Sequence, residues 1–251
     1  TSIEYVTNFI SSGRNIDEIV YKKTLARHCA INNSLESLKL LVENGCDTRM
    51  LLTTAIRNSS YAIFDYLLTQ DVDINELTQN HVTPINFAVH MQKRYFINRL
   101  LLAGADSTIP DENLLTPIYF AAEFGYNDIV RLLLDNGTST AFLNKAPSPL
   151  VASIKNKHSR VAFSLIQNGA DPNGSEKSDE NAFAISIKND QISIFRLLLS
   201  VGVKAEGYEE MMSEEMKEIF KEWDVKPSEE HKEFENELNV LISRINIIQS
   251  G

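Results

Sequence analysis

The stretch TPIYFAAEFGYNDIVRLLLDNG, residues 116–137, decides the fold. Thr116 can cap a helix, and Pro117 suits the first helical turn, where a missing N–H costs no hydrogen bond. Gly125 then separates this first short helix from a second one, which is rich in Ile, Val and Leu and ends before Gly137. Gly137 suits the left-handed conformation that terminates helices. The stretch therefore predicts two short helices joined by a tight turn.

Copies of this unit recur along the whole chain at a nearly constant period. The turn that follows the second helix recurs six times, at intervals of 26 to 33 residues, beginning at Gly45, Asp71, Gly104, Gly137, Gly169 and Gly202. A helix start precedes each of these turns by 21 residues, at Thr24, Met50, Thr83, Thr116, Ser148 and Asn181. One such unit cannot bury both of its apolar faces, so we expect neighbouring units to stack into one continuous core.

These residues resemble the ankyrin repeat, whose pattern is a T-P-L-H-x-A start, a G-x-x-x-I/V-V-x-L-L-L second helix and a G-A-D-x-N turn. The resemblance covers about residues 2–206. It implies an all-α solenoid of stacked helix-turn-helix units with β-hairpin fingers at right angles to the helices. The motif His is Asn86 in one unit and Tyr119 in the next, and the unit from Ser148 keeps only Ser-Pro-Leu. We therefore expect lower stability than in a regular array of equal length.

The repeats predict an ankyrin domain over residues 1–206. It consists of a half repeat at 1–13 and units that end near residues 45, 71, 104, 137, 169 and 202. Because Gly13 precedes Gly45 by 32 residues, we expect the chain to open inside a repeat of a longer protein. The unit that ends at Asp71 lacks about seven residues between Asp47 and Met50. One finger is therefore expected to be absent or reduced to a tight turn.

The acidic segment 207–251 predicts a C-terminal helical hairpin. Apolar residues recur at helical spacing on both sides of Pro227, at Met212, Met216, Ile219 and Trp223 and then at Phe234, Leu238, Leu241, Ile245 and Ile248. Two interpretations stay open: the hairpin caps the last repeat, or residues 228–249 bind a partner or dimerise. The second helix has fewer than three full heptads, which favours the cap.

Composition argues against several classes of function. The 251-residue chain has a net charge of -10 and no Lys/Arg block, so nucleic acid is not an expected partner. No apolar run is long enough for membrane insertion. Cys29 and Cys46 are the only cysteines, too few for a disulfide framework. We expect a cytoplasmic, reducing location, which becomes a host cytosol if the protein is a secreted effector.

Catalytic chemistry has no convincing residue pattern in this segment. His28 and Cys29 are adjacent, but neighbours on a helix do not face each other, and both cysteines occupy positions of small buried residues. The five histidines lack zinc-binding spacing. Residues 169–178 resemble a phosphate loop with two residues inserted, but a helix rather than a strand precedes them. We therefore expect no enzyme activity, no cofactor and no metal site.

Function is expected from the surface instead. In an ankyrin array the fingertips and the exposed side of the first helices form a concave face, where apolar residues that stacking does not require indicate a binding patch. The predicted protein-binding residues are Leu77, Gln79, Asn80, Val82, His90, Met91, Glu112, Asn113, Leu115, Glu123, Phe124, Lys155 and Asn156. The same stripe includes Pro110, Lys188 and Asn189.

The leading hypothesis is a protein–protein interaction module that binds a partner protein through this concave face. The alternative is the substrate-recognition arm of a larger enzyme, or of a host-directed effector, whose catalytic part lies outside this segment. A third hypothesis is a membrane-channel or cytoskeletal linker array. All three use the same module, so the sequence alone does not separate them.

Overall fold

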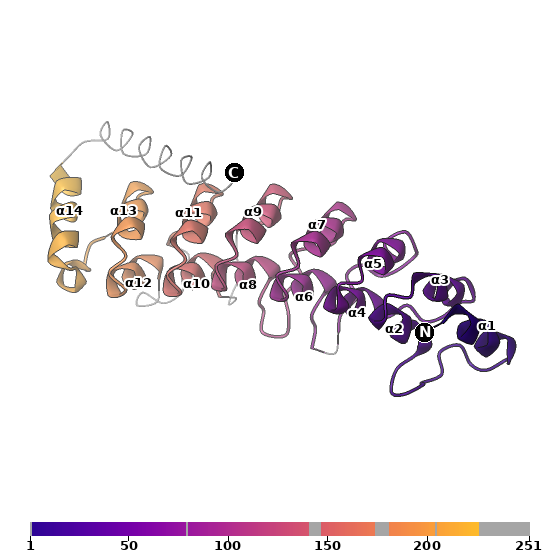
Figure 1. The fold of residues 1–251 in the computed structure, drawn as a ribbon. Coiled ribbons are helices and arrows are strands. Elements are labelled where there is room, and N and C mark those ends of the chain that lie inside the picture. Colours follow the sequence, from indigo (N-terminus) through magenta and orange to yellow (C-terminus); the bar gives the residue numbers. More distant parts are fainter. Residues whose placement is uncertain (1, 79, 141–146, 174–180, 204, 226–251) are drawn as a thin grey trace. The chain divides into compact units, whose positions relative to one another are not determined.

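The computed structural model describes residues 2–78, 80–140, 147–173, 181–203 and 205–225 (Figure 1). The chain divides into two compact units, residues 1–147 and 148–251, and each is described by itself. The predicted boundary at 206/207 stays a prediction. In the described part of the chain, no helix is long and apolar enough to cross a membrane.

The first unit is built from two rows of short helices (Figure 1). One row contains α2 (Leu25–Ile31), α4 (Leu51–Asn58), α6 (Pro84–His90) and α8 (Pro117–Glu123), which contact one another in succession. The other row contains α1 (Ile3–Ser11), α3 (Leu35–Glu43), α5 (Tyr61–Leu67), α7 (Arg94–Leu102) and α9 (Asn127–Asp135). Each helix of the first row from α2 to α8 packs on the helix that follows it in sequence. These pairs are the repeated units.

The first helix of most repeats begins at a side-chain cap. In two repeats of residues 1–147, Thr24 and Thr83 accept hydrogen bonds from the backbone N–H of Arg27 and Asn86, three residues further on. This bond satisfies a donor that the start of a helix otherwise leaves unpaired. Thr116 makes no such side-chain bond, so the expected cap at this position is absent. There α8 begins with Pro117 alone, whose missing N–H needs no partner.

In several repeats, the second helix is followed by a glycine with a left-handed backbone conformation, as at Gly137. Gly137 has φ +80°, and a Cβ atom there would meet open space, so the backbone conformation rather than crowding favours glycine. The backbone N–H of Gly137 donates to Leu134 O at 2.9 Å, and that of Thr138 donates to Leu133 O at 3.0 Å. These two bonds satisfy carbonyls at the end of α9 and turn the chain back toward the next unit.

Loops project from the ends of the first-row helices at residues 12–24, 68–83 and 103–116 (Figure 1). Each is closed by a backbone pair, between Val20 and Lys23, Thr78 and Val82, and Asp111 and Leu115. These are the fingers, and in the described residues they hold one isolated β-bridge, Val20 with Lys23, and no extended strand. The connection 44–50, between α3 and α4, is short and forms no comparable loop.

The second unit repeats the same plan. It contains α10 (Pro149–Lys155), α11 (Ser159–Gln167), α12 (Ala182–Lys188) and α13 (Ile192–Ser200), then a single 3-10 turn and α14 (Glu214–Val225). α14 packs on α13, and its Met216 and Ile219 are buried, as is Met212 just before it. The second predicted tail helix, after Ser228, and the proposed dimerisation segment 228–249 lie outside the described residues.

Neighbouring repeats are joined by a buried hydrogen bond in the first unit. Ser60, before α5, is 1% exposed, and its Oγ donates to the carbonyl of Ala30 in α2 at 2.7 Å. We predict that Ser60→Ala lowers the free energy of unfolding by about 1 to 2 kcal/mol, because a buried carbonyl loses its donor. Urea unfolding measures this. The exposed Ser11→Ala is the control, and equal losses in both variants would contradict the prediction.

Two nearby methionines test how much α14 contributes to the second unit. Met216 is fully buried, whereas Met211 is 53% exposed. We predict that Met216→Ala lowers the free energy of unfolding by about 2 to 5 kcal/mol, because it removes a buried side chain and leaves a cavity. Met211→Ala should change it by less than about 0.5 kcal/mol. Thermal melts of both variants check this, and an unchanged melt for Met216→Ala would mean that α14 does not stabilise the unit.

Candidate functional site

Four aromatic side chains lie together at the adjoining ends of α6 and α8. The His90 and Phe120 rings have centroids 3.9 Å apart, and Phe120 and Phe124 stack nearly parallel at 6.3 Å. Phe124 also contacts His90, at 5.9 Å, and Tyr126, at 5.6 Å. We call His90, Phe120, Phe124 and Tyr126 the α6–α8 aromatic cluster. Its members come from two neighbouring repeats.

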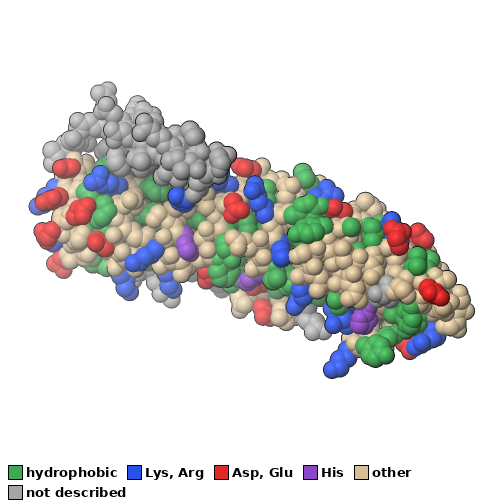
Figure 2. Space-filling view, in the orientation of Figure 1, with side chains coloured by type: hydrophobic (Ala, Val, Ile, Leu, Met, Phe, Trp, Pro, Cys, Tyr) green, Lys and Arg blue, Asp and Glu red, His purple; other side chains and the backbone are tan. Residues whose placement is uncertain are grey.

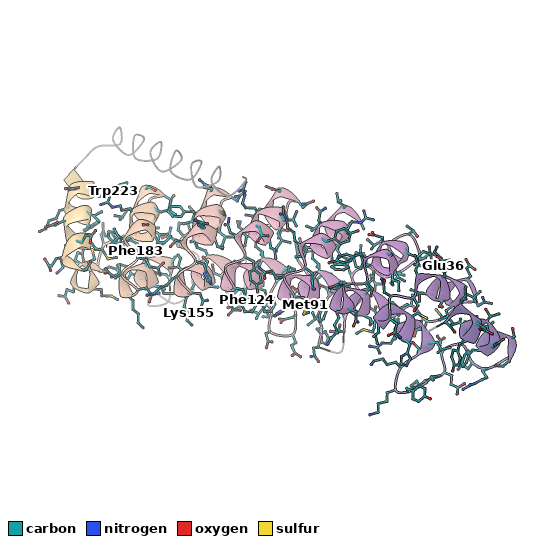
Figure 3. All side chains as sticks on the ribbon, viewed as in Figure 1. Glu36, Met91, Phe124, Lys155, Phe183 and Trp223 are labelled. Carbon is teal, nitrogen blue, oxygen red and sulfur yellow. The ribbon has the colours of Figure 1, made fainter. Side chains whose placement is uncertain are left out.

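The backbone explains why part of this cluster is exposed. Met91 and Phe124 are the residues that end α6 and α8, and each is followed by a left-handed residue, Gln92 or Gly125. Met91 is 41% exposed and Phe124 is 44% exposed, whereas Phe120 is only 6% exposed. Figure 3 shows Met91 and Phe124 beside each other at the ends of the first-row helices. A buried ring thus supports an exposed one.

Burial and nearby carboxylates act in opposite directions on the His90 imidazole. Partial burial against the neighbouring rings lowers the pKa of His90, while the charges of Asp111 and Glu123 oppose this effect, and the net shift is downward. The Tyr119 hydroxyl donates to Glu123 Oε1 at 3.4 Å, and burial followed by the Glu123 charge raises the pKa of Tyr119. At neutral pH the cluster is therefore uncharged and bordered by carboxylates.

The structure places most of the sequence-predicted residues of the first unit on its surface. The exposed ones are Leu77, Asn80, His90, Met91, Glu112, Asn113 and Phe124. The partly buried ones are Val82, Pro110, Leu115 and Glu123. Gln79 lies outside the described residues. The ring contacts bring together His90 and Phe124 from this set. Their selection as binding residues stays a prediction.

The finger at 103–116 exposes a different leucine from the predicted one. Leu115 is partly buried, because its N–H donates to Asp111 Oδ1 and its carbonyl accepts from the Asp111 N–H, both at 2.9 Å. Leu114 has a left-handed backbone, with φ +64°, and is 43% exposed. The apolar character of this fingertip therefore comes mainly from Leu114.

Lys155 and Asn156 belong to the second unit. Both are exposed, as is Lys188, whereas Asn189 is partly buried and its Nδ2 donates to Lys155 O at 3.5 Å. These residues form a polar, basic surface of that unit. A single surface that joins them to the α6–α8 aromatic cluster stays a prediction.

Several aromatic residues were missed by the sequence reasoning. Phe120 fits the core pattern, and only its spacing of four from Phe124 could have indicated that the two rings stack. On α5 and α7, the Tyr61 ring stacks on Phe96 and meets Tyr95 edge-on, both at 5.0 Å. Tyr61 is 48% exposed and Tyr95 is 43% exposed, and Figure 2 shows hydrophobic side chains gathered over α7. This second aromatic surface lies on the other row of helices.

The two cysteines are buried, as their positions in the repeat predict. Cys29 is fully buried and Cys46 is 7% exposed. Burial raises the pKa of the Cys46 thiol to about 12, which disfavours the thiolate that nucleophilic chemistry requires. In the described residues, no three or more His, Cys, Asp or Glu residues are grouped so that they could hold a metal ion. The segment 174–178, the end of the loop that resembles a phosphate loop, lies outside them.

Comparison with known proteins finds ankyrin repeats in this chain, in agreement with the fold. A profile described as ankyrin repeats, in three copies, matches residues 51–145. Alpha-latrocrustotoxin-Lt1a of Latrodectus tredecimguttatus is 34% identical over 134 residues, which are 51% of this chain and 9% of the toxin. The putative ankyrin repeat protein FPV244 of Fowlpox virus (strain NVSL) is 25% identical over 166 residues, which are 66% of this chain and 22% of that protein.

A solved structure shares the fold. The ankyrin repeat domain of Bcl-3, a member of the IkappaB protein family, matches with a TM-score of 0.69 and 21% identity, covering 77% of this chain and 91% of that chain. The chain spans less than a quarter of either curated relative named above. The profile identifies ankyrin repeats in residues 51–145, and the chain shares its fold with a solved ankyrin repeat domain. Ankyrin repeat domains are generally protein–protein interaction modules.

The downward shift at His90 gives a pH prediction. Because the pKa of His90 is below its ordinary value of 6.5 in the folded state, unfolded chains take up this proton first as the pH falls. The contribution of neutral His90 to stability is therefore complete above pH 6.5 and decreases toward the lower folded pKa. Urea unfolding at pH 7.5 and 5.5 should show a smaller loss of stability in His90→Gln than in the parent. An equal loss in both proteins would contradict the assignment.

Proposed function

We propose that this ankyrin array binds a partner protein through the α6–α8 aromatic cluster together with Met91. The observation that carries the proposal is the exposed Phe124 ring, which stands on the buried Phe120 ring instead of in the core. Repeat stacking does not require an apolar side chain at that position. Exposed aromatic and Met side chains within a polar border are what protein interfaces enrich.

The cluster is organised before a partner arrives. Phe124 contacts three other rings, those of His90, Phe120 and Tyr126, and these contacts restrict its rotation. A side chain that is already held in place loses little conformational entropy when it binds. Phe124 therefore suits the role of an anchor.

The acidic residues around the cluster favour a partner with positive charge. The charges of Asp111 and Glu123 act on His90 in the cluster, Glu112 is exposed next to Asp111 in the sequence, and the whole chain carries a net charge of -10. A partner segment with an apolar side chain flanked by Lys or Arg complements this surface, and charge complementarity raises the association rate and the specificity. We propose that the partner is such a basic, apolar segment of a protein.

The relatives also support the host-directed alternative. A poxvirus protein and a spider toxin contain related segments, and both are far longer than this chain. We infer that this segment contributes recognition, and that any catalytic part belongs to another region of the full protein. The two buried free thiols fit the proposed intracellular, reducing location.

Site-directed photo-crosslinking in cells of the source organism tests the surface while the partner is still unidentified. A benzoylphenylalanine at position 124 or 91 should form a discrete adduct, which mass spectrometry then identifies. The same group at Leu102, which is 67% exposed on the other row of helices, is the control. Equal adducts from all three positions, or an adduct from Leu102 only, would refute the proposed surface.

The identified partner then allows a quantitative test. We predict that Phe124→Ala weakens binding by about 1 to 3 kcal/mol, as expected for a buried aromatic anchor. Stability should fall much less, because the ring is exposed in the free protein. Isothermal titration and thermal melts measure the two effects, with Leu102→Ala as the matched control. A large loss of stability with unchanged affinity would assign Phe124 to the core.

A further inference from the structure

Three successive repeats of the first unit carry side chains of different charge at one repeat position, near the end of the first helix. These are Arg57 on α4, His90 on α6 and Glu123 on α8. Because α4 packs on α6 and α6 packs on α8, the three side chains follow one another along the row of first helices. The charge changes from positive at Arg57, through the neutral His90 ring, to negative at Glu123. We call these three residues the α4–α8 charge row.

The positive end of the row is accessible and held in place. Arg57 is exposed, and its guanidinium carbon lies 4.9 Å from the centroid of the Phe87 ring on α6. This cation–π contact positions the charge without a counter-ion. Arg57 takes part in none of the ion pairs found among the described residues. The Arg57 guanidinium can therefore bind a carboxylate that a partner supplies, and its fork of N–H donors suits that geometry.

The other end of the row is acidic. The Glu123 carboxylate accepts a hydrogen bond from the Tyr119 hydroxyl at 3.4 Å, which orients it on α8. The charges of Glu123 and of Asp111, in the finger 103–116, both act on the His90 ring. The two carboxylates therefore lie at the same end of the row, where they attract a positive side chain.

Aromatic contacts connect the two ends into one surface. The Phe87 ring, which lies beneath Arg57, and the His90 ring are three residues apart on α6 and so point to the same side of that helix. On its other side, the His90 ring contacts Phe120 and Phe124 of α8, with centroids 3.9 and 5.9 Å apart. The α6–α8 aromatic cluster thus lies between a positive end and a negative end.

The packing of the helices sets the distance between the two charged ends. Packed helices lie about 8 to 10 Å apart, so Arg57 and Glu123, which are two helices apart, are separated by about 16 to 20 Å. An extended chain rises about 3.3 Å per residue, so a segment needs about five or six residue steps to reach from one end to the other.

We propose that the α4–α8 charge row selects an extended partner segment in which an acidic and a basic residue stand about six residues apart, with apolar residues between them. The acidic side chain binds Arg57, the basic one lies at Glu123 and Asp111, and the apolar ones cover Met91 and Phe124. Opposite charges at the two ends fix which way the segment lies across the helices. This inference rests on the proposed function, to which it adds an acidic residue at a set spacing.

Three acetylated, amidated peptides test the charge row: Glu-Ser-Leu-Gly-Leu-Ser-Lys, its reverse Lys-Ser-Leu-Gly-Leu-Ser-Glu, and the dibasic Lys-Ser-Leu-Gly-Leu-Ser-Lys. ¹⁵N NMR titrations measure their dissociation constants up to the millimolar range. One of the two mixed-charge peptides should bind the parent about tenfold more tightly than the dibasic peptide, because Arg57 attracts Glu and repels Lys. The net charge of -10 acts in the opposite sense, since it favours the dibasic peptide.

Charge reversal at Arg57 gives the second part of the test. Arg57→Glu should reverse the preference, so that the dibasic peptide binds about tenfold more tightly than either mixed-charge peptide. Arg94→Glu is the matched control, because Arg94 is an exposed arginine at the start of α7, in the other row of helices. It changes the net charge by the same amount and should leave the preference of the parent unchanged.

The proposal is overturned if the dibasic peptide binds the parent as tightly as both mixed-charge peptides, if Arg57→Glu leaves the preference unchanged, or if Arg94→Glu reverses it as well. The first of these outcomes needs no variant, so it holds even if Arg57→Glu does not fold. Phe124→Ala separates the two proposals: if it weakens binding of every peptide and no charge preference is seen, the aromatic surface stands and the charge row fails. If no peptide shifts the resonances of α6 and α8, both proposals fail.

Discussion

The close contact between first helices of successive repeats is the constraint on which the rest of the structure depends. Five residues after each unit start lies a small side chain, and each of these is fully buried: Cys29, Ala55, Ala88 and Ala121 in the first unit, and Ser153 and Ser186 in the second. A larger side chain would hold neighbouring helices apart and leave voids, which protein interiors do not tolerate. Because each contact joins only adjacent repeats, stability accumulates along the array, and the surface residues are free to vary.

The sequence predicted much of the fold because its signals are local. A left-handed glycine, a proline in the first turn and a small residue at a fixed distance each act within a few residues, so Gly137, Pro117 and Cys29 could be assigned without a structure. The missing side-chain cap at Thr116 shows the limit of this approach. A threonine hydroxyl can rotate away from the helix, and the pattern of residue types does not determine its rotamer.

The candidate site could be predicted only in part. The repeat pattern predicts which side chains lie on the surface, but not which side chains of the next repeat they contact. The sequence pattern placed His90 and Phe124 on the surface, where the structure has them. It did not indicate that Phe120 supports both rings, since that contact joins two repeats. Likewise, the exposure of Leu114 instead of Leu115 follows from a left-handed backbone and two hydrogen bonds within one finger.

The proposed binding surface lies where this array departs from the regular repeat. At the position of the motif His, Asn86 still reaches the next finger, whereas the Tyr119 hydroxyl donates to Glu123 beside the cluster. A regular repeat satisfies its own polar groups and covers its own apolar surface, so it gives a partner little to bind. An irregular one leaves an aromatic ring exposed, and the stability lost there can be recovered when a partner covers the ring. In this chain, departures from the pattern therefore indicate function better than agreement with it.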